Sequence, residues 1–351
     1  MTPLARLQAR WRFAVTGILL AIPLIRLHAQ EMPQRLVLVY AGGPHRPAYT
    51  VDDLVHFVAV VDTSDRPVDW LCDGVLFLEI QATSGRSYQP RPNAAPSNGS
   101  DWTAYLDSLF ANEGPVARLD SAAGVVARVA GAPGRAVAVA IMVPYPDPRA
   151  DTIRFGGHVF SMHIDSSRAA AAAAYMRDAT QRFASRQVRN EVLVAFYWMN
   201  EGITSGDTAL VRKVAAEVHA QRKRFLWIPA YRAAGWDQWR VLGFDQAWLQ
   251  PNYFFHPEVP NTRLDSALTL ARGAGLGMEL EFDRRMFDSW QWADRLEPYL
   301  ALFESAPDMR GRPIAIYEGG GALMRLARSK DAWHRALYQR LVVDLRPAAR
   351  P

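Results

Sequence analysis

Residues 277–283 read Gly-Met-Glu-Leu-Glu-Phe-Asp, with an acidic side chain at every second position from Glu279. In a β-strand, successive side chains point to opposite faces, so Glu279, Glu281 and Asp283 share one face. A surface strand can carry such a stripe, but the apolar runs elsewhere in the chain are typical of a buried parallel sheet. Carboxylates inside a fold cost free energy unless they are paired or used. The stretch therefore predicts a buried strand whose carboxylates are either paired with other groups or used by a functional site.

Similar apolar runs recur along the chain and alternate with amphipathic segments. The eight predicted strands are residues 35–41, 74–80, 136–143, 191–200, 225–229, 246–252, 278–282 and 314–318. The predicted helices are residues 51–61, 102–110, 116–129, 167–185, 207–222, 236–241, 264–272, 292–304 and one or two helices in 322–343. Long loops are expected at 82–101 and 147–165. Strict alternation over eight units predicts a single (β/α)8 barrel, with an open doubly wound sheet as the alternative.

The composition narrows the classes of function. The chain has 351 residues, half of them hydrophobic, and a formal net charge of +5. Nearly all the positive charge is arginine scattered along the chain, without the Lys/Arg block of a nucleic-acid-binding segment. We therefore expect no nucleic-acid partner. We attribute the positive net charge to the compositional bias of the source genome. An acidic partner such as an anionic polysaccharide is the alternative explanation.

The N-terminus has the pattern of a secretory signal. Arg6, Arg10 and Arg12 precede an apolar stretch at 13–25, and Ala29 offers a cleavage site. We expect a signal peptide at 1–29 and a barrel domain at 30–351, in a secreted or periplasmic protein without stable membrane insertion after cleavage. An uncleaved anchor is the alternative, although the stretch is short of the about 20 residues that a membrane span needs. Cys72 is the only cysteine, so no internal disulfide is possible.

Residues at the ends of the predicted strands should meet at one face of the barrel, where such folds carry their active sites. Two carboxylates flanking a bond are the minimal equipment of a glycosidase, and Glu201 and Glu281 are the predicted pair. Amides and carboxylates bind sugar hydroxyls, while aromatic faces stack on pyranose rings. The predicted substrate contacts are Asn200, Trp198, Glu79, Trp227, Tyr231, Gln250, Asn252, Tyr253, Asp283, Tyr317 and Glu318.

The placement of Asn200-Glu201 on the fourth strand, with Glu281 on the seventh, resembles the largest clan of retaining (β/α)8 glycosidases. The resemblance implies that Glu201 is the acid/base, that Asn200 binds the 2-hydroxyl of the sugar and that Glu281 is the nucleophile. Asp283 is also available on the seventh strand, so the nucleophile stays open between Glu281 and Asp283.

More closely, the chain resembles an uncharacterised bacterial family of secreted proteins that is catalogued as a domain of unknown function. The segments that carry the resemblance are Phe-Tyr-Trp-Met-Asn-Glu at 196–201, Phe-Leu-Trp-Ile-Pro at 225–229, Leu-Gln-Pro-Asn-Tyr-Phe-Phe at 249–255 and Glu-Leu-Glu-Phe-Asp at 279–283. The resemblance covers most of the mature chain and implies no particular activity.

Structural interpretations stand beside the functional ones. Glu201 can cap the next helix, Glu281 can pair with Arg284 or Arg285, and Glu279 lies deeper and is expected to be structural. Trp198, Trp227 and Tyr253 are equally compatible with barrel packing.

Other kinds of site have weaker signals. The spacing of His158 and His163 fits no common metal site, and no cofactor is predicted. The glycines at 319–321 predict a tight turn, with a phosphate cradle as the alternative. The sequence thus predicts a glycoside hydrolase with a carbohydrate substrate, with a non-catalytic glycan-binding barrel or a phosphate-handling enzyme as alternatives. It leaves the sugar and the oligomeric state open.

Overall fold

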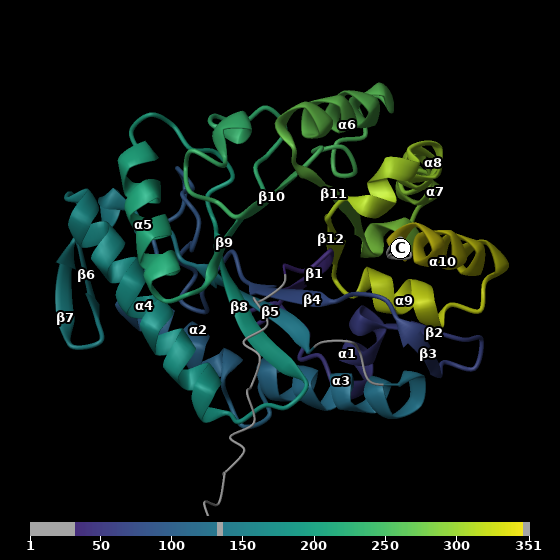
Figure 1. Ribbon diagram of the computed structural model, residues 1–351, viewed down its shortest axis with the longest axis horizontal. Coiled ribbons are helices and arrows are strands. Elements are labelled where there is room, and N and C mark those ends of the chain that lie inside the picture. The colour runs from purple at the N-terminus through teal and green to yellow at the C-terminus, as the bar shows by residue number, and fades with distance from the viewer. Residues whose placement is uncertain (1–31, 132–135, 347–351) are drawn as a thin grey trace, which may run out of the picture. The chain divides into compact units, whose positions relative to one another are not determined.

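The computed structural model describes residues 32–131 and 136–346, so the predicted signal peptide at 1–29 lies outside the described residues. Within these residues, eight parallel strands close into one barrel (Figure 1). In order around the barrel they are β1 (Arg35–Tyr40), β4 (Gly74–Leu78), β5 (Val137–Val143), β8 (Glu191–Trp198), β9 (Arg224–Trp227), β10 (Gln246–Leu249), β11 (Gly277–Asp283) and β12 (Ile314–Gly319). The prediction of a single (β/α)8 barrel is confirmed, and the open sheet is excluded because β1 pairs with β12.

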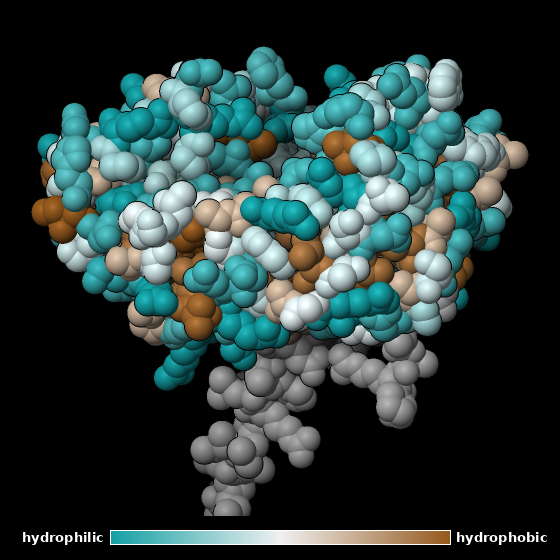
Figure 2. Space-filling model, turned by 90° about the horizontal axis from the view of Figure 1, so that it is seen from above, coloured by the Kyte–Doolittle hydropathy of each residue, from teal (hydrophilic) through white to brown (hydrophobic). Residues whose placement is uncertain are grey.

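Helices surround the strands (Figure 1). They are α1 (Val51–Val58), α2 (Gly99–Leu109), α3 (Pro115–Ala130), α4 (Asp165–Ser185), α5 (Thr208–Ala220), α6 (Thr262–Ala274), α7 (Trp290–Ala293), α8 (Glu297–Ser305), α9 (Ala322–Arg328) and α10 (Ala332–Leu345). Short 3₁₀ turns are η1 (Pro148–Ala150), η2 (Trp236–Gln238), η3 (Arg284–Phe287) and η4 (Pro307–Gly311). In the described part of the chain, no helix has the length and apolar character needed to cross a membrane. Hydrophilic side chains cover most of the face in Figure 2, which is hollowed at its upper edge.

Two antiparallel hairpins outside the barrel were not predicted. β2 (Ala59–Val61) pairs with β3 (Pro67–Trp70), so the helix expected over 51–61 ends at Val58. β6 (Thr152–Phe155) pairs with β7 (His158–Ser161) inside the predicted loop 147–165. Gly156 and Gly157 both have positive φ, as a two-residue hairpin turn with this twist requires.

The single helix predicted over 292–304 is also wrong, because the structure has two helices there. Ser289 caps α7, and its side chain accepts from the N–H of Gln291. Pro298 lies in the first turn of α8, where its missing N–H and fixed φ are tolerated. The break between the helices leaves Arg295 outside both, and its side chain points into the loop that follows β10.

The strand register places the acidic stripe at one end of the barrel. In the pairing of β11 with β12, Glu281 lies opposite Tyr317 and Asp283 lies opposite Gly319. β10 is shorter and pairs with β11 at Gly277 and Met278. The upper part of β11 therefore borders the loop after β10, whose backbone reaches Glu281.

At the opposite end of β8, Glu191 is a buried carboxyl group whose effect on stability can be measured. The residue is buried, and neither carboxylate oxygen has a hydrogen-bond partner among the described residues. Burial, together with Asp120, raises the pKa of Glu191 well above its ordinary value of 4.5. The folded protein therefore holds this proton more tightly than the unfolded chain does. The stabilising contribution is complete below the unfolded pKa and is lost as pH rises above it.

We therefore expect Glu191→Leu to raise the free energy of unfolding at pH 8 by about 1–3 kcal/mol, the usual cost of an unsatisfied buried polar group. The gain should shrink at pH 4, and urea denaturation at the two pH values measures it. Glu113→Leu, at an exposed position, is the control and should change stability by less than about 0.5 kcal/mol. An equal gain at both pH values would contradict the electrostatic explanation.

Candidate active site

The C-terminal end of the barrel interior holds a cluster of tyrosines and carboxylates. The pKa of Tyr40 on β1 is raised by burial and then by its neighbours Tyr317, Tyr197, Glu279 and Glu201. Because β1 and β8 do not adjoin in the barrel, only the interior brings Tyr40 and Tyr197 close together. The rings of Tyr40 and Tyr317 meet edge to face at 5.5 Å. The acids of β11 thus face inward, toward Glu201.

Glu201 is held just beyond the end of β8 by its backbone. The indole N–H of Trp227 donates to the carbonyl of Asn200 at 2.7 Å, and the N–H of Ala230 donates to the carbonyl of Glu201 at 3.1 Å. The side chain is partly exposed. Burial and then the Glu281 carboxylate raise the pKa of Glu201, while Arg91 and a hydrogen bond from Gln89 lower it. The pKa of Glu201 is raised on balance, which favours a proton donor.

Glu281 is fully buried and receives hydrogen bonds from two elements. One carboxylate oxygen accepts from the N–H of Tyr253 at 3.0 Å and from the hydroxyl of Tyr299 on α8. The other oxygen has no partner among the described residues. Burial raises the pKa of Glu281 on balance, and the hydrogen bonds from Tyr299 and Tyr253 act in the opposite direction. These donors stabilise the ionised carboxylate, which is the form that a nucleophile needs.

Glu279 lies two residues earlier on the same face and has a different environment. It is buried, and one of its oxygens has no hydrogen-bond partner in the described structure. Its pKa is raised well above the ordinary value by burial, and then by the charges of Glu281 and Glu201. Glu279 therefore holds its proton more tightly than a carboxyl group in water does.

Asp283, the other candidate nucleophile, is engaged by its own turn. Its carboxylate caps η3 by accepting from the N–H of Arg285 at 2.9 Å, and it forms an ion pair with the guanidinium of Arg285 at 2.9 Å. That guanidinium lies 4.1 Å from the ring of Trp292. These contacts give Asp283 a structural role in the turn that ends β11.

The loop after β10 carries Gln250, Asn252 and Tyr253 toward Glu281. Asn252 has a positive φ of 50°, and its side-chain oxygen accepts from the N–H of Tyr231 at 2.8 Å. Arg295 fixes the rest of the loop by donating to the carbonyls of Phe254 at 3.1 Å, His256 at 2.8 Å and Tyr253. Its guanidinium also lies 3.7 Å from the ring centre of Tyr253. Tyr231, Asn252 and Tyr253 therefore form one connected rim beside Glu281.

Glu79, at the end of β4, is bound by the loop after β1. The guanidinium of Arg46 donates to both of its carboxylate oxygens, at 2.8 and 3.0 Å. The N–H groups of Ile80 and Gln81 donate to the same carboxylate at 2.7 and 3.3 Å. A Cβ at Gly43 would lie 2.1 Å from this carboxylate, so only glycine allows the loop so close. Glu79 thus joins two loops at the barrel rim.

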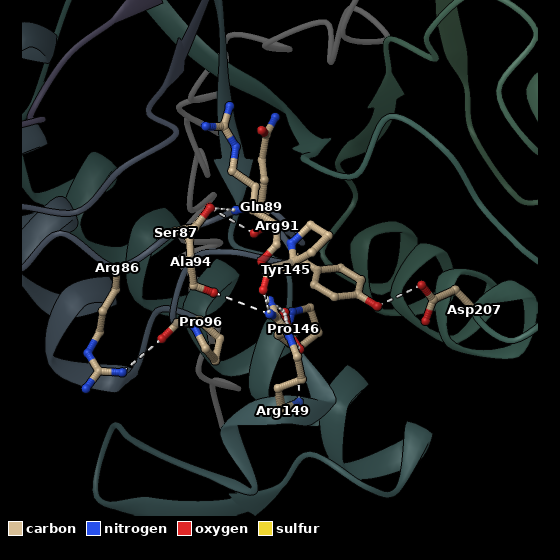
Figure 3. A network of polar contacts seen from close by, with 12 residues as sticks. Arg86, Ser87, Gln89, Arg91, Ala94, Pro96, Tyr145, Pro146, Arg149 and Asp207 are labelled. Carbon is tan, nitrogen blue, oxygen red and sulfur yellow. Dashed lines mark hydrogen bonds and ion pairs between the residues drawn. The ribbon is translucent and has the colours of Figure 1, made fainter.

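The long loop between β4 and α2 brings Gln89 and Arg91 to Glu201. Arg149 pins this loop by donating to the carbonyls of Arg91 at 2.9 Å and Ala94 at 3.3 Å. Asp147 holds Arg149 in turn, with a shortest contact of 2.6 Å. In Figure 3 the side chains of Gln89 and Arg91 project in the same direction, away from Arg149.

Three of the predicted substrate contacts lie away from the interior cluster. Trp198 is fully buried and packs edge to face against Phe225. Trp227 is also fully buried and stacks on Phe244 at 5.0 Å. Glu318 is buried beside the start of α9, where it accepts from the N–H of Leu323 at 3.3 Å. The other predicted residues border the cluster or the loops around it.

The glycine turn after β12 is a tight turn. Gly320 and Gly321 both have positive φ, and Gly321 directly precedes α9. Hydrogen bonds from the N–H groups of Leu323, Ala322 and Gly321 lower the pKa of Glu318 against the larger effect of its burial. Since Glu318 already takes these donors, they are not available to a phosphate. Among the described residues, no group of three or more His, Cys, Asp or Glu side chains is arranged to hold a metal ion.

The sequence did not identify Gln89, Arg91, Tyr299 or Arg295 as members of this region. Gln89 and Arg91 lie in a loop whose path no periodic pattern predicts, and Tyr299 lies on an outer helix. The composition of loop 82–101 marked it only as long and irregular.

The fold and this cluster define a (β/α)8 barrel with inward-facing acids at the C-terminal ends of its strands. The chain belongs to the family described as "Domain of unknown function (DUF4855)", whose model matches residues 35–343. The predicted resemblance to a family of unknown function is thereby confirmed. No curated protein matches the chain.

Solved structures match the chain along most of its length. A GH18 chitinase, ChiB from the chitin utilization locus of Flavobacterium johnsoniae, is 10% identical, over 88% of this chain and 93% of its own, with a TM-score of 0.44. The pneumococcal virulence factor StrH is 10% identical, over 89% and 82%, with a TM-score of 0.40. A mutant tryptophan synthase α-subunit from Pyrococcus furiosus is 10% identical, over 88% and 96%, with a TM-score of 0.35. Likenesses of this degree carry no information on activity.

Proposed function

We propose that the protein is a glycoside hydrolase that cleaves a polysaccharide or oligosaccharide outside the cytoplasm with retention of the anomeric configuration. The observation that carries this proposal is the meeting of Glu201 and Glu281 at the C-terminal end of one barrel, close enough for the charge of Glu281 to raise the pKa of Glu201. Two carboxylates that differ in exposure and in hydrogen bonding can act as acid and nucleophile on one glycosidic bond.

The two environments support different roles. Glu201 is partly exposed and accepts few hydrogen bonds, so it can hold a proton and donate it to the departing sugar oxygen. Glu281 is stabilised as an anion by Tyr253 and Tyr299, so it can attack the anomeric carbon. Water then hydrolyses the glycosyl-enzyme intermediate, with ionised Glu201 as the base. Asn200, next to the acid, is the proposed ligand for the 2-hydroxyl.

The rim offers the groups that sugars require. Tyr40 and Tyr317 are half-buried aromatic rings within the cluster, and Gln250 and Asn252 supply amides beside Glu281. One oxygen of Glu281 and the amide oxygen of Gln250 are buried without a partner in the described structure. Buried polar atoms of this kind are normally satisfied, and substrate hydroxyls would satisfy them.

The full burial of Glu281 favours a second candidate function, a barrel that binds glycans without cleaving them. A nucleophile must touch the anomeric carbon, and Glu281 has no exposed surface in this conformation. Catalysis therefore requires that the loop that carries Tyr253 moves and exposes Glu281 when the substrate binds.

The test is hydrolysis of a panel of plant and bacterial polysaccharides, with the anomer of the first product read by NMR. We expect one glycan to be cleaved with retention, and Glu201→Gln to lower kcat/KM by about 10²–10⁴-fold, the usual contribution of a general acid. Glu113→Gln is the matched control at an exposed position and should leave the rate unchanged. Binding of a glycan without cleavage would instead support the second candidate function.

A further inference from the structure

A cavity of about 300 Å³ lies between the loops that follow β1 and β4, and Arg91 in its lining is the residue that connects it with Glu201. The loop after β1 contributes Pro44, His45 and Arg46, and the loop after β4 contributes Gln81 and Arg91. Both loops lie at the C-terminal ends of their strands, on the same side of the barrel as Glu201. The volume is at the lower end of the range for ligand pockets and suits one sugar residue.

The charged groups of this cavity that have unused hydrogen-bonding capacity are basic. Glu79 is the acidic side chain that lines it, and four hydrogen bonds from Arg46, Ile80 and Gln81 already occupy its carboxylate. The third nitrogen of Arg46, Nη1, has no hydrogen-bond acceptor in the described part of the chain. His45 is exposed on the same wall.

Arg91 is the group that distinguishes this cavity from an ordinary surface hollow. Its side chain is exposed, and its guanidinium has no hydrogen-bond acceptor among the residues that the structure describes. Its backbone is nevertheless fixed, because Arg149 binds the carbonyl of Arg91. The guanidinium is close enough to Glu201 to lower the pKa of that acid. A cation on a pinned loop, without a partner of its own, is prepared for a ligand.

We propose that this cavity binds the anionic group of an acidic sugar, a carboxylate or a sulfate ester, in the ring next to the bond that Glu201 protonates. Arg91 would pair with the anion, and Nη1 of Arg46 would be the second donor. A planar guanidinium binds both kinds of oxyanion through paired hydrogen bonds. This inference rests on the proposed function for the site, because it names the class of glycan that the site accepts.

The experiment is affinity electrophoresis in native gels at 0.15 M NaCl, which screens long-range attraction by the basic chain. The probes are polygalacturonate and its carboxyl-reduced form, and carrageenan and its desulfated form. Glu281→Gln serves as the parent protein, so that no probe is degraded during the run. We expect retardation by an acidic probe and not by its neutral counterpart. The pair that shows the difference identifies the anion as carboxylate or sulfate.

Arg91→Ala in this parent is expected to weaken the retardation by about tenfold or more, as for a lost charge-assisted hydrogen bond. Arg91→Lys should restore part of it. Arg189→Ala is the matched control, because it removes one exposed arginine just before β8, at the opposite end of the barrel. Equal retardation by acidic and neutral probes, no retardation at all, or equal losses in Arg91→Ala and Arg189→Ala would each overturn the proposal.

Failure of the anionic-sugar site can be distinguished from failure of the proposed hydrolase function. Retardation by an acidic probe, with no glycan of the panel cleaved by the wild-type protein, would support the binding site and reject the hydrolase. Cleavage of neutral glycans, with no retardation by any acidic probe, would support the hydrolase and reject the anionic site.

Discussion

Glu281→Gln is expected to lower kcat/KM on the identified glycan by about 10³-fold or more, whereas Glu279→Gln should retain activity within about tenfold. Both residues are buried on the same face of β11, and both lie within electrostatic reach of Glu201. The difference follows from their hydrogen bonds. Glu281 receives the N–H of Tyr253 and the hydroxyl of Tyr299, so it can carry negative charge. Among the described residues Glu279 has no such donors, and burial raises its pKa, so an uncharged amide in its place is expected to change little.

Asp283→Asn is the third variant of this series, and it tests whether Asp283 rather than Glu281 is the nucleophile. Its carboxylate is bound by Arg285, so the substitution should weaken the turn at η3 and affect kcat/KM less than Glu281→Gln does. Steady-state kinetics at saturating and subsaturating substrate measure all three variants, and circular dichroism confirms that each is folded. A larger loss in Glu279→Gln or Asp283→Asn than in Glu281→Gln would reassign the nucleophile.

The barrel was predictable because each parallel strand is covered on both faces and is therefore apolar along its length. The same property explains what the sequence could not show. In β8 both Tyr197 and Trp198 are buried, and nothing in the run 191–198 tells which face lies inside the barrel. The sequence interpretation placed Trp198 at the rim, whereas the structure packs it against Phe225 and turns Tyr197 toward the carboxylates.

Alternation and strand ends were enough to predict that Glu201 and Glu281 lie at the C-terminal end of the barrel, and their catalytic role stays a prediction. Their partners were not predictable, because Gln89, Arg91 and Tyr299 reach the site from a long loop and an outer helix. The path of such a loop is set by single contacts, here the hydrogen bonds of Arg149 to the carbonyls of the loop. No periodicity encodes contacts of that kind.

Arg295→Met is expected to lower the free energy of unfolding by about 3 kcal/mol and to reduce kcat/KM strongly at temperatures where the variant is still folded. Arg295 is 8% exposed, and its guanidinium donates to the carbonyls of Tyr253, Phe254 and His256. Methionine fills much of the same volume but leaves these buried carbonyls without a donor. The loop would then shift, and the N–H of Tyr253 would no longer be held against Glu281.

Arg263→Met separates this effect from a general loss of arginine contacts near the loop. Arg263 is only partly buried, lies 4.1 Å from the ring centre of Tyr231 and donates to the carbonyl of Pro251 at 3.2 Å. Its loss should cost about 1 kcal/mol or less, with a small change in kcat/KM. Thermal denaturation and kinetics at 20 °C measure both variants. If Arg295→Met lost stability but kept full kcat/KM, the loop after β10 would not position Glu281, because the N–H of Tyr253 depends on Arg295 for its place.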